Sequence, residues 1–143
     1  FIIVDEPTVG LDPEERIRFR GILSRLSAKR TILISTHIVG DISSTCEDLA
    51  ILRQGQLLFH GAPEDFIAKA EGKTWLLQTN DNAFEAIANR FNVTNINADG
   101  VGMELRIVGD EAPPPGAEAA PPNLEDAYIY FMGAHSATLQ AGV

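Results

Sequence analysis

Two adjacent carboxylates and a distant imidazole stand where they could act on a ligand. Asp5 and Glu6 follow the apolar run 1–4, and His37 follows a second apolar run, residues 31–35. Ligands of open α/β sheets bind beyond the carboxyl ends of the strands. An isolated acidic pair, or a lone histidine, is usually only the solvated start of a loop in such a place. The ordered pattern that joins these residues favours a ligand site instead.

The segment between the two apolar runs has the features of a crossover helix. Asp12 is a good N-cap, Pro13 suits the first helical position, and acids occupy the first turn. Apolar residues then recur at i, i+3, i+4 and i+7, and Lys29-Arg30 closes the segment. The apolar residues of that stripe are Phe19, Ile22, Leu23 and Leu26. Strand, helix and strand in this order predict a βαβ unit with a parallel sheet, its strands buried on both faces.

Three short motifs in this region resemble those of one family, the ATP-binding-cassette (ABC) proteins. FIIVDEP is similar to their Walker B segment, TVGLDP to their D-loop, and STH at residues 35–37 to their H-loop. The order of the motifs and the spacing between Glu6 and His37 also match. The resemblance covers residues 1–72, and it is specific because three motifs agree jointly.

The resemblance implies hydrolysis of ATP with Mg²⁺, a reaction that depends on positioning and charge neutralisation. Asp5 would hold Mg²⁺ through its water shell, since Mg²⁺ prefers oxygen ligands and dehydrates reluctantly. Glu6 would orient the attacking water or accept its proton. His37 would contact the γ-phosphate and link it to Glu6 and the D-loop. The D-loop residues that would face a second subunit are Gly10, Leu11 and Asp12.

Other motifs of that family do not occur in the sequence. It contains no Gly-x-x-x-x-Gly-Lys-[Ser/Thr] phosphate-binding loop and no Ser-Gly-Gly signature, and an apolar run begins at Phe1. We therefore expect the C-terminal part of an α/β P-loop ATPase core in residues 1–72. Alone, this part is expected to be inactive.

The rest of the core region predicts short elements. A short helix is expected over residues 38–46, a hairpin of strands 49–52 and 57–60, and a helix that begins near Pro63 and ends at Gly72. His60 and His135 lack any motif context and are assigned no site. Cys46, the single cysteine, can form no intramolecular disulfide and is expected to be inert.

Residues 73–143 predict a small α+β accessory domain. Strands are expected at 74–79, 93–96 and 103–108, a helix at 83–91, and a terminal helix capped by Asn123, with Trp75 and Phe84 in the core. Residues 111–122, rich in Pro and Ala, predict an extended, mobile linker. NLEDAY at residues 123–128 resembles the end of ABC-2-type exporter ATPases, although it also fits a simple amphipathic helix. The resemblance implies a regulatory or dimer-supporting role.

Composition narrows the function further. The net charge is −9, and residues 73–143 carry 3 basic and 9 acidic residues, which disfavours a nucleic-acid partner. No apolar run is long enough to insert in a bilayer, so a membrane role would need a partner. A single cysteine fits a cytoplasmic setting.

The hypothesis is therefore the ATP-hydrolysing subunit of an ABC transporter, more specifically an exporter of drug-exporter type. It would sit on the cytoplasmic face of the membrane, bound to a membrane permease and to a second ATPase subunit, either identical or a paralogue. Two alternatives stay open: an accessory dimerisation or regulatory module, and a soluble ABC ATPase outside transport.

Overall fold

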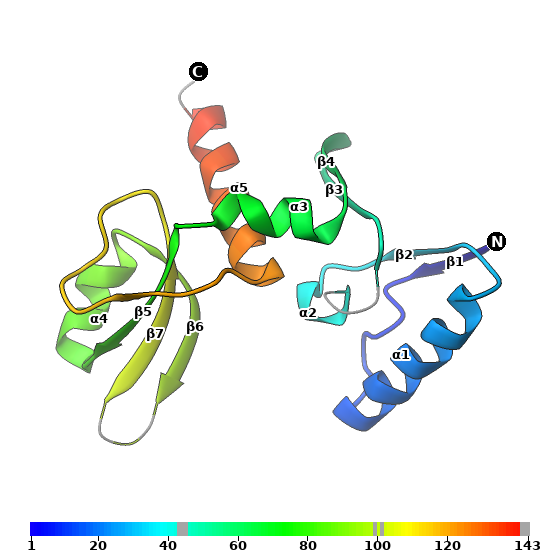
Figure 1. Ribbon diagram of the computed structural model, residues 1–143, viewed down its shortest axis with the longest axis horizontal. Coiled ribbons are helices and arrows are strands. Elements are labelled where there is room, and N and C mark those ends of the chain that lie inside the picture. The colour runs from blue at the N-terminus through cyan, green and yellow to red at the C-terminus, as the bar shows by residue number, and fades with distance from the viewer. Residues whose placement is uncertain (43–45, 99, 101, 141–143) are drawn as a thin grey trace.

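The computed structural model describes residues 1–42, 46–98, 100 and 102–140, which form a mixed α/β molecule with three small sheets (Figure 1). The elements in chain order are β1 (Ile2–Asp5), α1 (Pro13–Ser27), β2 (Ile32–Ser35), α2 (Val39–Ile42), β3 (Leu49–Arg53), β4 (Gln56–Gly61), α3 (Pro63–Ile67), a 3₁₀ turn η1 (Ala68–Ala70), β5 (Thr74–Thr79), α4 (Asp81–Ala88), β6 (Asn92–Ala98), β7 (Met103–Val108), β8 (Glu118–Ala119) and α5 (Leu124–Gln140). Among the described residues, no helix is both long enough and apolar enough to cross a membrane.

The first sheet is the parallel pair β1–β2, joined by α1 as the sequence predicts. The pairing runs in register from Ile2 opposite Ile32 to Asp5 opposite Ser35. The prediction that both faces of these strands are buried is wrong: Ile3 and Leu33 lie opposite each other and are 68% and 56% exposed. Half-buried and exposed side chains alternate along both strands, because α1 covers only one face of this two-stranded sheet. The wider parallel sheet of a P-loop core is thus not seen in the described residues.

The second sheet is the predicted hairpin β3–β4. Its two turn residues, Gln54 and Gly55, have φ angles of 51° and 77°. Two consecutive positive φ values are typical of the tight turn whose twist matches that of paired strands. The helix that follows is shorter than predicted, because α3 ends at Ile67 and continues as the 3₁₀ turn η1. Of the helix predicted at 38–46, residues 39–42 are helical and residues 43–45 lie outside the described residues.

The third sheet contains four antiparallel strands in the order β6-β7-β5-β8. The predicted succession of strand, helix and two strands is confirmed as β5, α4, β6 and β7. The segment predicted as a linker contains β8, whose Ala119 and Glu118 pair with Trp75 and Leu76. Two residues of this Pro-rich segment therefore extend the sheet.

Two clusters of apolar residues form the core of the molecule from α2 onwards. The first lies between the third sheet and α4, where Trp75, Phe91, Leu105 and Ile107 are buried and Phe84 packs against them, which confirms Trp75 and Phe84 as core residues. The second joins the hairpin, α3, β7 and α5. Its buried members are Leu49, Ile51, Phe66, Ala70, Val108, Leu124 and Ala127. The helix α5 thus packs against elements on both sides of residues 72–73.

A buried ion pair fixes the start of α5 to the sheet. Asp126 is 0% exposed and accepts hydrogen bonds from Arg106 Nε at 2.8 Å, from the Thr94 hydroxyl at 2.6 Å and from the backbone N–H of Asn123 at 2.9 Å. The side chain of Asn123 in turn accepts from the backbone N–H of Asp126 at 2.9 Å, so Asn123 caps the helix as predicted. Every bond to the buried carboxylate therefore also orients α5.

We expect Asp126→Ala to lower the free energy of unfolding by about 3–5 kcal/mol, since it leaves the guanidinium of Arg106 without its buried partner. Denaturant unfolding followed by circular dichroism measures this change. The neighbouring Glu125→Ala is the control, because Glu125 is exposed and its loss should cost little. Equal stability of the two variants would contradict a structural role for the pair.

A second, exposed ionic cluster joins the same helix to the sheet. Asp110 Oδ1 lies 2.8 Å from Lys73 Nζ and accepts a hydrogen bond from the Tyr130 hydroxyl at 2.7 Å. The hydrogen bonds from Lys73 and then from Tyr130 lower the pKa of Asp110. The contact with Asp110 raises the pKa of Lys73 and that of Tyr130. The ionised carboxylate is thus the favoured form in the folded protein.

We expect Asp110→Asn to reduce stability at neutral pH but not in acid. The folded pKa of Asp110 lies below its ordinary value of 3.8, so its contribution is complete above that pH and is lost as the pH falls through the folded pKa. Unfolding free energies of wild type and variant over a pH series give the measurement, with the exposed Glu71→Gln as control. A difference that persisted unchanged in acid would refute this assignment.

Candidate functional site

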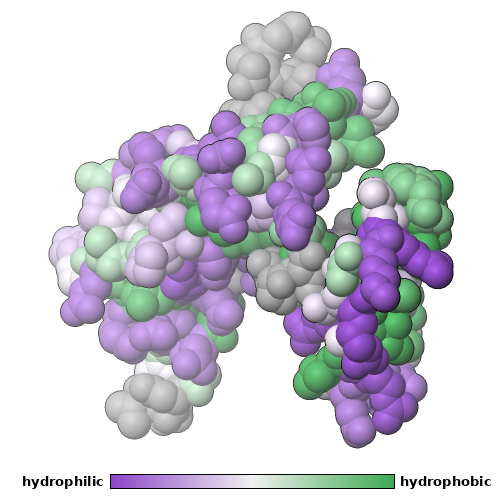
Figure 2. All heavy atoms as spheres, turned by 45° about the vertical axis from the view of Figure 1, so that its right-hand side comes forward, coloured by the Kyte–Doolittle hydropathy of each residue, from purple (hydrophilic) through white to green (hydrophobic). Residues whose placement is uncertain are grey.

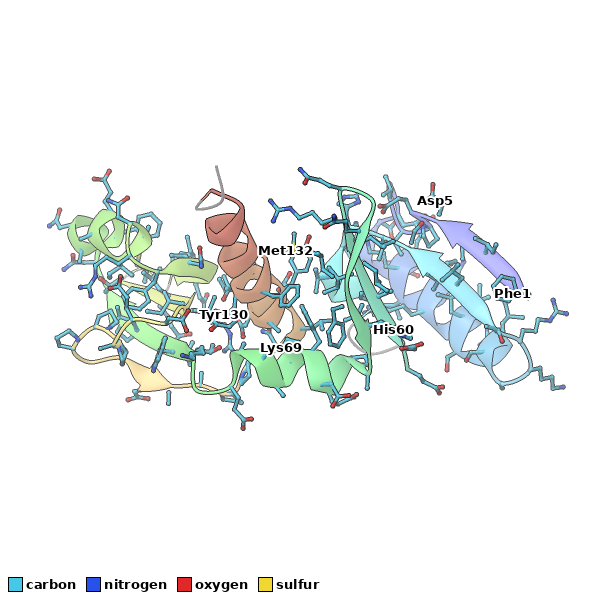
Figure 3. The ribbon with its side chains drawn as sticks, turned by 90° about the horizontal axis from the view of Figure 1, so that it is seen from above. Phe1, Asp5, His60, Lys69, Tyr130 and Met132 are labelled. Atoms are coloured by element: carbon cyan, nitrogen blue, oxygen red, sulfur yellow. The ribbon has the colours of Figure 1, made fainter. Side chains whose placement is uncertain are left out.

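The candidate site lies at the carboxyl ends of β1 and β2. Because the strands are parallel and adjacent, Asp5 stands opposite Ser35. The segment after β1, which begins with Glu6, and the segment after β2, which contains His37, therefore leave the sheet at neighbouring positions. The backbone N–H of Glu6 donates to the carbonyl of Ser35 at 2.8 Å, and the Ser35 hydroxyl donates to Asp5 Oδ1. The structure therefore brings together the three residues singled out from the sequence. Figure 3 shows Asp5 at this end of the sheet, with Phe1 at the other.

Glu6 and His37 are in direct contact. Nδ1 of His37 lies 2.8 Å from Glu6 Oε1, and the backbone N–H of His37 donates to the same oxygen at 3.1 Å. The other oxygen, Oε2, is buried and has no hydrogen-bond partner within the described residues. The backbone of Glu6 has a φ of 46°, which few residues other than glycine adopt. This conformation turns the chain sharply after β1 and directs the carboxylate toward the next loop.

The exposure of the pair differs between its members. The His37 side chain is 72% exposed, whereas that of Glu6 is 35% exposed. The imidazole is thus open to solvent on the side away from Glu6, while the carboxylate is partly enclosed. A ligand at this end of the sheet would meet the imidazole first and the carboxylate behind it.

The loop between Glu6 and α1 is held at both ends and open at its tip. Thr8 is 3% exposed, and its hydroxyl has no partner within the described structure. Val9 and Gly10 at the tip are exposed, and Gly10 has a φ of 82°, which favours glycine. The backbone carbonyl of Leu11 accepts from Arg16 Nε at 3.2 Å. The tip of the loop is therefore exposed to solvent, while hydrogen bonding and burial hold the two ends of the loop in place.

Asp12 closes this loop as the N-cap of α1, as predicted. Its Oδ1 accepts from the backbone N–H of Glu15 at 2.8 Å, and its own N–H donates to Glu15 Oε2 at 3.2 Å. Such reciprocal bonds satisfy two donors that a helix start would otherwise leave unpaired. The loop and the first turn of α1 are thus one connected unit.

The sequence did not reveal two contributors to the site. Ser35 belongs to the STH segment that resembles an H-loop, but its hydrogen bond to Asp5 follows from the register of the parallel strands, which a single sequence does not specify. Thr8 belongs to the TVGLDP segment that resembles a D-loop, but no feature of the sequence predicts that its side chain is buried. No signal in the sequence separates a buried threonine in a loop from an exposed one.

Of the other reactive side chains, those that the structure describes do not join this site. His60 pairs with Asp48 at 2.9 Å on the exposed surface of the hairpin, and the side chain of His135 lies outside the described part of α5. Burial raises the pKa of the Cys46 thiol, which disfavours its reactive thiolate. Within the part of the chain that the structure describes, no group of three or more acidic, histidine or cysteine side chains could hold a metal by itself.

Comparison with known proteins gives partial matches to ATP-binding subunits of ABC transporters. A cobalt import ATP-binding protein, CbiO of Salmonella typhi, is 39% identical over 72 residues, which are 50% of this chain and 27% of that protein. The Nod factor export ATP-binding protein I of Paraburkholderia xenovorans is 36% identical over 72 residues, 50% of this chain and 24% of the relative. A putative ABC transporter ATP-binding protein of Mycoplasma pneumoniae is 34% identical over 70 residues, 48% of this chain and 21% of the relative.

The matches therefore cover about half of this chain and only about a quarter of these relatives. No family model matches the chain. The similarity is nevertheless consistent across relatives whose names specify import in one case and export in another. Over the matched half, this chain is thus similar to ATP-binding subunits of transporters.

We expect Asp12→Ala to loosen the first turn of α1 at a cost of about 1 kcal/mol, because the Glu15 N–H loses its acceptor. Amide hydrogen exchange at Glu15 and Arg16 reports this local change. Asp12→Asn is the matched control, since asparagine caps helices about as well as aspartate. Unchanged exchange in the alanine variant would show that the cap contributes nothing.

Proposed function

We propose that this chain is the C-terminal part of an ATP-hydrolysing subunit of an ABC transporter. The observation that carries the proposal is the contact of Glu6 with His37, beside Asp5, at the ends of two adjacent parallel strands. The similarity to transporter ATP-binding proteins over half of the chain supports it independently. Residues 1–72 would belong to the ATPase core and residues 73–143 to an accessory domain.

The donor chemistry of the site fits Mg²⁺ bound together with a nucleotide. Mg²⁺ usually keeps several waters and takes only one or two protein carboxylates along with substrate phosphates. Asp5 offers such a carboxylate at the strand end, and the Ser35 hydroxyl holds one of its oxygens. When bound, the ion would neutralise charge on the terminal phosphates. We infer that Asp5 is its protein ligand, directly or through water.

Glu6 is suited to act on the water that attacks the γ-phosphate. Its Oε1 is occupied by two contacts with His37, which fix the carboxylate in place. Its Oε2 is buried and has no partner among the described residues, so it is an acceptor left for a donor that the described part of the chain does not supply. A general base in this position is typically worth roughly 10²–10⁴-fold in rate. His37 would position Glu6 through Nδ1, and the opposite, solvent-exposed side of its ring would contact the γ-phosphate.

A complete site would need groups beyond these. The 143 residues hold no Gly-x-x-x-x-Gly-Lys-[Ser/Thr] sequence, so the loop that binds the phosphates would come from elsewhere in the complete protein. The exposed tip of the D-loop, with Gly10 followed by Leu11 and Asp12, would face a second ATPase subunit, identical or paralogous. We infer that residues 1–143 alone do not hydrolyse ATP.

The membrane partner follows from the same proposal. The subunit would act on the cytoplasmic face of a membrane and drive a separate permease. Relatives that are named for import and for export match about equally well, so they do not decide the direction. We favour export because residues 123–128 resemble the end of exporter ATPases. Transport is favoured over a soluble ABC ATPase by the names of the relatives.

We expect Glu6→Gln in the complete protein to lower ATP turnover by at least about 10²-fold, because an amide cannot accept the proton. It should still bind ATP and accumulate as an ATP-bound dimer. Steady-state phosphate release and nucleotide binding measure the two effects. Glu14→Gln, on the exposed first turn of α1, is the matched control and should turn over normally. Normal turnover by Glu6→Gln would exclude the proposed role.

A further inference from the structure

A small cavity borders the candidate site. Its lining includes Pro7 and Thr8, which directly follow Glu6, and Thr36, which directly precedes His37. Residues of α1 and β2 form other parts of its wall. The two segments that hold the carboxylate against the imidazole are therefore supported by packing around the same small space.

The residue Ile42, at the end of α2, also lines this cavity. The helix α2 begins at Val39, and the backbone N–H of Ile38 donates to the Thr36 hydroxyl at 3.0 Å. Only one turn of helix and this hydrogen-bonded link separate Ile42 from His37. A displacement of Ile42 therefore moves the segment that carries the imidazole.

The same side chain packs against the second apolar cluster, whose buried members include Phe66 and Leu124. The helix α2 lies against α5, which contributes Leu124 and several half-buried side chains to this cluster. The start of α5 is in turn fixed to the third sheet by the buried ion pair of Asp126 and Arg106. Because protein interiors are close-packed, they transmit small displacements from one element to the next. The position of α2 thus depends on α5.

We propose that Ile42 is a positioning residue for Glu6 and His37, and that α5 holds it in place. It acts through α2 and through the cavity wall, not on the substrate. The proposal rests on the proposed function, in which the pair acts on ATP, and adds that the last helix of the chain stabilises the geometry of that pair. Truncating Ile42 enlarges the cavity, and the surrounding structure relaxes only partly around such a space.

Amide hydrogen exchange of the 143-residue chain tests the geometry without ATP. The backbone N–H of His37 donates to Glu6 Oε1 at 3.1 Å and so reports on the contact directly. Ile42→Ala should cause a loss of protection at His37 but not at Ile107, which is buried in the first cluster. Ile42→Val, which removes a single methyl group, should retain most of the protection. Unchanged protection at His37, or equal losses at His37 and Ile107, would overturn the proposal.

The two methionines of the chain give a matched test of the link to α5. Tyr130 and Met132 are two positions apart on the helix and so lie on opposite sides of it, as labelled in Figure 3. Tyr130 donates to Asp110 beside the third sheet, whereas Met132 packs against the cluster that Ile42 contacts.

Met132→Ala should therefore reduce protection at His37 in the same direction as Ile42→Ala. Met103→Ala removes an equally half-buried methionine that packs against the first cluster, and should leave His37 unchanged. Equal effects of the two methionine variants, or no effect of Met132→Ala, would exclude a role for α5.

Turnover by the complete protein gives the functional test. Ile42→Ala should lower kcat by up to about 10²-fold, because a shift of about 1 Å in a catalytic group can cost that much. The KM for ATP should stay unchanged, since an interaction that matters only in the transition state alters kcat alone. Ile42→Val should restore most of the turnover. Normal kcat in Ile42→Ala, or a change confined to KM, refutes a positioning role.

The proposal and the proposed function fail in different ways. Normal turnover by Glu6→Gln would remove the catalytic assignment, while a loss of His37 protection in Ile42→Ala would still establish the structural link. An inactive Glu6→Gln together with a fully active Ile42→Ala would preserve the proposed function and refute the role of Ile42.

Discussion

The parallel pairing of β1 with β2 is the constraint on which the candidate site depends. It places the ends of two strands, thirty residues apart in sequence, at neighbouring positions, so that Ser35 meets Asp5 and His37 meets Glu6. None of these contacts is local in sequence. A slip of one residue in this register would turn each side chain to the other face of the sheet and separate the carboxylates from the imidazole.

The helix α5 has the corresponding role in the rest of the chain. Its first turn carries the buried Asp126, which binds Arg106 of β7, and its apolar face packs with Phe66 of α3. Phe66 contacts Phe59 at 4.8 Å and Phe131 at 5.2 Å between ring centroids. Hairpin, helix and sheet are therefore connected through one element near the end of the chain. Figure 3 shows α5 between the hairpin and the third sheet.

Local signals in the sequence predicted most of the helices and strands. Features that depend on residues distant in sequence, such as burial and strand register, could not be predicted. Apolar runs, the Asp12 cap and the turn at Gln54-Gly55 are short-range features, and the structure confirms the strands, helix and hairpin that they indicate. Burial depends on what else covers a strand, so the exposed faces of β1 and β2 could not be foreseen. The hydrogen bond between Ser35 and Asp5 likewise needed the register of the sheet. The chemical roles of Asp5, Glu6 and His37 stay predictions that only measurements of the complete protein can decide.

The uncovered face of the first sheet has a consequence for how this chain would fare in a cell. Ile3 and Leu33 pair across the two strands and are both exposed, so they form an apolar surface on this sheet. Figure 2 shows hydrophobic residues at the surface along the edge of the right-hand part of the molecule. Chaperones and proteases recognise such surfaces and remove the proteins that display them. Abundance in vivo would then depend on how quickly another surface covers this face, and expression with a covering partner should increase the soluble yield.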